Sequence, residues 1–105
     1  MIRSKGLTEA ARGQECTLRL DNNVCNGNSE TTIFAHFNDG YQGMALKAND
    51  TSGCFACSAC HDVIDGRVPH TFDEAYIWER KFKANQETLH IWDAIGVLVV
   101  KRRAA

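Results

Sequence analysis

Five cysteines constrain this chain of 105 residues more than any other feature of its sequence. Cys57 and Cys60 have the two-residue spacing with which a tight turn presents two thiolates to one metal ion. A domain of this length has a small core and benefits from a structural metal or a disulfide. The first residues carry Arg3 and Lys5 but no apolar stretch typical of a secretory signal. We therefore expect a cytoplasmic, reducing environment, in which paired cysteines bind metal.

The cysteines predict one structural zinc with tetrahedral thiolate coordination. The predicted ligands are Cys16, Cys25, Cys57 and Cys60. Eight residues lie between Cys16 and Cys25, which is wider than usual, but the turn-forming residues 21–23 can fold the two ends together. The alternative is that the first two are small buried side chains. Cys54 has no close partner, so we expect a packed thiol there.

The run from Cys57 to His61 also fits the attachment motif of c-type haem. That attachment takes place after export, and the chain starts without an export signal, so we expect no haem. No apolar run approaches the length of a membrane span, so we expect no membrane association either.

Hydrophobic patterns predict one α+β domain over residues 1–105. The predicted helices cover 7–12, 57–65 and a long segment from Thr71 to Gly96, and the predicted strands cover 16–20, 31–37, 44–46 and 97–100. Thr71 and Glu74 have capping-box spacing, which would start the long helix, while its polar 81–87 stretch permits a break. Its predicted buried face is Ala75, Trp78, Phe82, Leu89, Trp92 and Ile95.

The overall charge gives no general attraction to nucleic acid, since the chain has 12 basic and 13 acidic residues and a net charge of −1. A nucleic-acid partner would need locally clustered basic residues and help from a metal ion. The candidates for phosphate contacts are Arg12, Arg19 and Arg67 with the basic tail 101–103, and Arg67 and Arg12 are the ones we select. For each, a solvated surface charge is the alternative.

Two histidines and an aspartate predict a second site. His61 and Asp65 are four residues apart, so on a helix they share one face and can hold one divalent cation. His36 ends a predicted strand, and the zinc knuckle would place it across from His61. The alternatives are a hydrogen-bonded core role for His36, support of the zinc site for His61, and a solvated Asp65.

These residues together resemble a known family. The segment from Phe34 to Phe37, a loop with Asn49 and Asp50, and the segment from Cys57 to Asp65 are similar to a ββα-metal (HNH, or His-Me finger) nuclease with an accessory four-cysteine zinc. More narrowly, they resemble the YbcO family of small phage and prophage proteins, described as probable nucleases. The resemblance covers roughly residues 8–73. It implies a zinc knuckle fused to an HNH-like core, followed by a C-terminal helix.

The resemblance also implies a metal-dependent endonuclease that acts on DNA in phage recombination or DNA processing. His36 would be the general base, and His61 and Asp65 would bind a catalytic magnesium or manganese ion at the scissile phosphate. Asn49, or alternatively Asn38, would orient the base. Such nucleases often carry a metal-binding Asp or His just before the base, whereas this chain has Ala35.

The sequence leaves an alternative function open, a zinc-dependent module that binds nucleic acid or protein without chemistry. It does not specify the DNA form, for which branched or structured DNA is one option. Nor does it specify the oligomeric state, for which a homodimer is one option because many nucleases pair to cut both strands.

Overall fold

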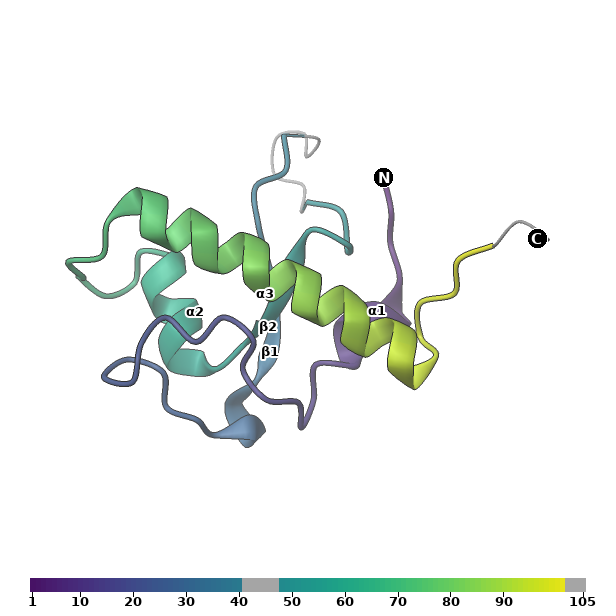
Figure 1. Cartoon of the computed structure of the whole chain (residues 1–105), viewed down its shortest axis with the longest axis horizontal. Coiled ribbons are helices and arrows are strands. Elements are labelled where there is room, and N and C mark those ends of the chain that lie inside the picture. The colour runs from purple at the N-terminus through teal and green to yellow at the C-terminus, as the bar shows by residue number, and fades with distance from the viewer. Residues whose placement is uncertain (41–47, 102–105) are drawn as a thin grey trace.

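The computed structural model describes residues 1–40 and 48–101. Its elements in chain order are α1 (Lys5–Glu9), the 3-10 helix η1 (Ser29–Thr31), β1 (Ile33–His36), β2 (Gly53–Ala56), α2 (Ser58–Ile64) and α3 (Glu74–Ile95). Figure 1 shows α3 crossing the two-stranded hairpin, with α1 and α2 towards opposite ends of the molecule. The predicted α+β class is confirmed as helices around a two-stranded sheet. No helix in the described ranges is long and apolar enough to cross a membrane.

The hairpin is antiparallel, and its register places Ile33 opposite Ala56 and His36 opposite Gly53. Gly53 has no room for a side chain, because an added Cβ would lie 2.6 Å from the Phe34 ring and closer still to a backbone oxygen of β1. The predicted strand at 31–37 is confirmed, with His36 at its end. β2 was missed by the sequence analysis, because its four residues are too few to show a period.

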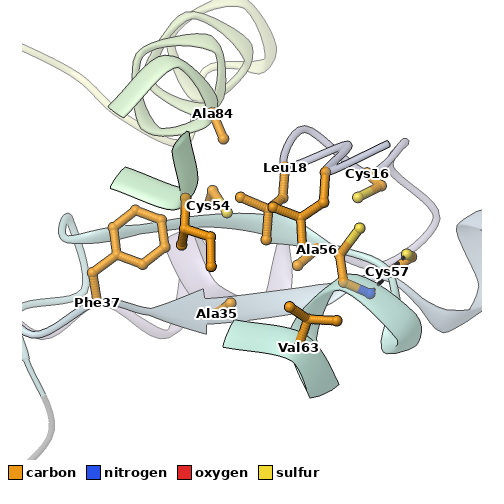
Figure 2. Close-up of a cluster of buried hydrophobic side chains, with 12 residues drawn as sticks. Cys16, Leu18, Ala35, Phe37, Cys54, Ala56, Cys57, Val63 and Ala84 are labelled. Atoms are coloured by element: carbon orange, nitrogen blue, oxygen red, sulfur yellow. Dashed lines mark hydrogen bonds between the residues drawn. The ribbon is translucent and has the colours of Figure 1, made fainter. Parts of the chain in front are cut away.

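Alternate side chains of the hairpin belong to two separate parts of the core. On one face Ala35 and Ala56 join the cluster that contains Val63 of α2, and Figure 2 shows this cluster with Ala84 of α3 on its other side. On the opposite face Phe55 packs with Leu7 and Trp92. The His36 ring lies on this second face, edge-on to Phe34 with 4.8 Å between ring centroids.

Two predicted strands are absent. Residues 16–20 form an irregular segment in which Thr17 N–H donates to the Phe55 carbonyl at 2.8 Å, and Arg19 has a φ of 37°, which interrupts an extended strand. Its Leu18 and Leu20 are nevertheless fully buried. Residues 97–100 form no strand either, and the predicted strand at 44–46 lies outside the described residues.

The long helix α3 differs from its prediction at its start and on its buried face. It begins at Glu74 after Asp73, without a side-chain cap, so the capping box was wrong, while the stop at Gly96 with φ of 80° is confirmed. It continues unbroken through residues 81–87. Of the six predicted core positions only Trp92 is buried, and the others on the buried face are Ile77, Ala84 and Thr88. Small and hydroxyl side chains there let the helix lie close to β2 and the 16–20 segment.

Candidate functional site

Four cysteines from three separate segments converge on one point. The Sγ atoms of Cys16, Cys25, Cys57 and Cys60 all lie within 4.8 Å of one another. In Figure 2, Cys16 and Cys57 point together at one end of the core cluster. Within residues 1–40 and 48–101, no other group of three or more His, Cys, Asp or Glu side chains is gathered in this way.

Local hydrogen bonds hold the cysteines in place. Cys57 is the N-cap of α2, and its Sγ accepts the Cys60 N–H at 3.4 Å. The predicted turn before Cys25 is present, because the Asp21 side chain accepts the Asn23 N–H at 2.9 Å and the next N–H along the chain. The turn therefore brings Cys25 back towards Cys16 despite the eight residues between them.

The sulfur atoms of the cluster are close enough to share protons. A hydrogen bond from Cys60 lowers the pKa of Cys16 to about 4, and the same contact raises the pKa of Cys60. All four can be thiolates at once only with a cation between them, because thiolates so close together repel one another. Zinc with four thiolate ligands fits the number, the softness and the spacing of these donors, and such a closed set is typical of structural zinc.

Cys54 lies apart from this group. It is fully buried in β2, and burial raises the pKa of its thiol to about 12. A thiol with so high a pKa stays protonated at neutral pH and acts as a small packed side chain.

His36, which is partly exposed, pairs with the buried Asp50. Its Nε2 lies 2.8 Å from Asp50 Oδ1, and the other carboxylate oxygen accepts the Ser4 N–H at 2.8 Å. Burial alone would raise the pKa of Asp50, but the hydrogen bonds from His36 and Ser4, with the nearby Arg3, lower it below its ordinary value. An ionised carboxylate only accepts hydrogen bonds, so His36 Nε2 must carry the proton. In the neutral ring, Nδ1 then has a free lone pair.

The side chains of Asn49 and Asn38 form hydrogen bonds with residues other than His36. The Asn49 side chain donates to Asp39 at 2.9 Å and accepts the Ile2 N–H at 2.6 Å, while Asn38 accepts the Gly40 N–H at 3.0 Å. The contact expected of an orienting asparagine is therefore made by Asp50, to which the sequence analysis gave no role. No signal in the sequence distinguished Asp50 from the adjacent Asn49.

His61 and Asp65 meet on α2 as predicted, with Nε2 and Oδ2 3.1 Å apart. Arg67 lies 3.5 Å from both Asp62 and Asp65, so its guanidinium is already engaged by two carboxylates. Arg12 is exposed in the turn after α1. No hydrogen bond or ion pair joins His36 to His61 among the described residues. His36 lies on the face of the hairpin that carries Phe34, whereas Val63 of α2 packs against the opposite face.

Comparisons with known proteins agree with this architecture. Residues 5–97 match the family described as "Putative nuclease YbcO". The chain is 43% identical over 93 residues to "Putative nuclease YbcO" of Escherichia coli strain K12, which covers 88% of this chain and 95% of that protein, and it is equally similar to the protein of the same name from Enterobacteria phage 82.

A solved structure is also similar. It is described as a putative bacteriophage protein from Escherichia coli K-12 MG1655, and it matches with a TM-score of 0.70 and 40% identity over 85% of this chain and 98% of that one. By both its sequence and its fold, the chain belongs to the YbcO family of phage and prophage proteins.

Proposed function

We propose that this protein is a metal-dependent endonuclease that hydrolyses phosphodiester bonds in DNA. The observation that carries the proposal is the His36–Asp50 pair, a histidine held by a buried carboxylate with its second ring nitrogen able to accept a proton. The description of its relatives as nucleases supports the choice of reaction.

In this mechanism His36 acts as the general base. Its Nδ1 takes a proton from a water molecule as the water oxygen attacks phosphorus. The ring then becomes positively charged, and the Asp50 carboxylate 2.8 Å from Nε2 stabilises that charge without accepting the proton. Because Asp50 is itself held by the Ser4 N–H, the ring is fixed before substrate binds.

His61 and Asp65 are proposed to bind the catalytic cation. His61 Nε2 and Asp65 Oδ2 lie 3.1 Å apart on one side of the helix, so both side chains could turn their donor atoms to one ion. Magnesium usually takes one or two protein ligands and completes its shell with water and substrate phosphate. Such an ion would stabilise the charge that develops on the phosphate and the leaving oxygen. Because His36 and α2 lie on opposite faces of the hairpin, the phosphate would have to lie at the strand end to meet both the base and the ion. Ala35 is buried and supplies no ligand.

The four-cysteine site has a different role in this proposal. Its ligands Cys57 and Cys60 directly precede His61 and fix the first turn of α2. Zinc with four thiolates has no open position for water, so it would stabilise the helix that presents His61 and Asp65 rather than take part in the chemistry.

The test is cleavage of supercoiled plasmid and of a branched DNA junction, with magnesium or manganese added to the zinc-loaded protein. His36→Ala should keep its zinc and lose roughly 10²–10⁴-fold in rate, the usual contribution of a positioned base. His90→Ala is the matched control, because His90 is an exposed histidine on α3. Full activity of His36→Ala would refute the proposed base. Absence of cleavage with every divalent ion would favour the binding module without chemistry.

A further inference from the structure

Two exposed aromatic side chains lie one turn apart on α3. Trp78 is 48% exposed and Phe82 is 66% exposed, on a helix whose outward face would ordinarily be polar. They border a hollow of about 230 Å³. Its other lining residues are Phe37, Asn38, Asp39, Thr51, Ser52, Lys81 and Asn85. Pockets for drug-sized ligands measure about 300–1,000 Å³, so this one suits a single ring system.

The hollow adjoins the proposed catalytic pair. Phe37 follows His36 in the chain and Thr51 follows Asp50, and both line the hollow. Figure 2 places Phe37 at the end of the core cluster opposite to Cys16 and Cys57. Because the hollow is lined by residues that follow β1 and precede β2, a ligand in it would lie beyond the strand end that carries His36 and away from the zinc site.

Lys81 gives the hollow a positive charge. Its Nζ lies 4.2 Å from the centroid of the Trp78 ring, and no hydrogen bond or ion pair joins it to any residue that the structure describes. Lys83 on the same helix, by contrast, pairs with Glu79 at 2.9 Å. Burial lowers the pKa of Lys81, which means that its ammonium group has lost hydration that an anion could replace. Asp39, the one carboxylate among the described lining residues, accepts hydrogen bonds from Asn49.

We propose that this hollow binds one unpaired nucleotide of the DNA strand next to the cleaved bond, with its base on Trp78 and Phe82 and its phosphate at Lys81. The inference rests on the proposed nuclease function and narrows its substrate to DNA with single-stranded segments. A base inside a duplex has both faces covered by its neighbours, whereas an unpaired base can stack on an aromatic side chain. Exposed rings beside a cation are a combination that binds single strands, and the Lys81 ammonium group contacts only the Trp78 and Phe37 rings among the described residues.

The experiment measures binding of a fluorescently labelled oligo(dT) of about ten nucleotides, and of a duplex of equal length, to the zinc-loaded full chain without magnesium or manganese. The single strand should bind more tightly than the duplex. Trp78→Ala should raise its Kd about 5-fold or more, as expected for the loss of one stacked base. Ile95→Ala is the matched control, since Ile95 is 49% exposed on the same helix but does not line the hollow, and its Kd should not change.

A second pair of variants tests the phosphate contact. Lys81→Gln should reduce the slope of log Kd against log salt by about 0.7, as for one lost contact to single-stranded DNA. Lys83→Gln, at a lysine already paired with Glu79, should leave the slope unchanged. Equal slopes for the two variants would overturn the assignment of Lys81.

Cleavage assays separate this inference from the nuclease proposal. If Trp78→Ala binds the single strand like the Ile95→Ala control while the protein still cuts DNA, the nucleotide site is wrong and the nuclease stands. If neither DNA form is bound or cut, both proposals fail. If Trp78→Ala instead abolishes a dimer seen by sedimentation and leaves DNA binding unchanged, the occupant is a second copy of this chain and the inference is overturned.

Discussion

Replacing Asp50 with asparagine tests the His36–Asp50 pair most directly, because the substitution preserves shape and removes one acceptor. The carboxylate accepts the Ser4 N–H on one oxygen and faces His36 Nε2 with the other. Asparagine offers one acceptor and one donor in these positions. If its oxygen keeps the Ser4 bond, its NH₂ faces Nε2 and moves the His36 proton to Nδ1. The nitrogen that would act as the base is then already protonated.

We therefore expect Asp50→Asn to fold, to retain zinc and to lose DNA cleavage by roughly 10²–10⁴-fold, comparable with the loss of the base itself. Stability should fall by about 1–3 kcal/mol, the usual effect of losing a hydrogen bond to a charged group in a buried site. Urea unfolding measures the stability, and ¹⁵N NMR of the His36 ring identifies which nitrogen carries the proton. Full cleavage with the proton still on Nε2 would refute this reasoning.

The same pair predicts how stability depends on pH. The pKa of Asp50 is lowered in the folded protein, so its contribution to stability is present above the unfolded value of about 3.9 and is lost as the pH falls through the lower folded value. Urea unfolding of the native chain should therefore show a loss of stability below about pH 4 that is smaller in Asp50→Asn. An identical loss in both proteins would assign it to other carboxylates.

The remaining predictions concern the two metal sites. Cys57→Ser should lose the zinc and give an unfolded or molten product, because in small metal domains the binding free energy of the metal is folding free energy. Cys54→Ala changes a neighbouring and equally buried cysteine, and it should keep the zinc and lower the free energy of unfolding by about 1 kcal/mol. Zinc analysis and circular dichroism distinguish these outcomes, and a Cys54→Ala protein without zinc would show that the ligand set is wrong. Asp65→Ala and His61→Ala should each raise the manganese concentration needed for half-maximal cleavage, and unchanged metal dependence in both would exclude them as ligands.

Features that depend on near neighbours in the chain could be read from the sequence. The Cys57–Cys60 spacing, the stop of α2 before Gly66 and the pairing of His61 with Asp65 all follow from the geometry of one or two helical turns. The four cysteines were also correctly chosen as a group placed to bind metal, because thiolates near one another in a small domain have few other uses.

Features that depend on contacts between distant segments were decided by the tertiary structure. The pattern of α3 pointed to a buried Trp78 and Phe82, but the surface available on β2 and the 16–20 segment admits Ala84 and Thr88 instead, since the Thr88 hydroxyl lies 3.1 Å from that of Thr17. The two aromatic rings were left exposed as a result, and no periodicity could have shown it.

The partner of His36 was decided in the same way. Asn49 and Asp50 are adjacent in a loop, and neither spacing nor residue type says which side chain will turn towards the strand end. The N-terminal segment decides, because Ile2 N–H bonds the Asn49 side chain and Ser4 N–H bonds Asp50, which leaves one carboxylate oxygen directed at His36. The sequence by itself therefore determined the four cysteines placed to bind a metal ion and the histidine at the strand end. Only packing between segments far apart in the chain determined which residue holds that histidine.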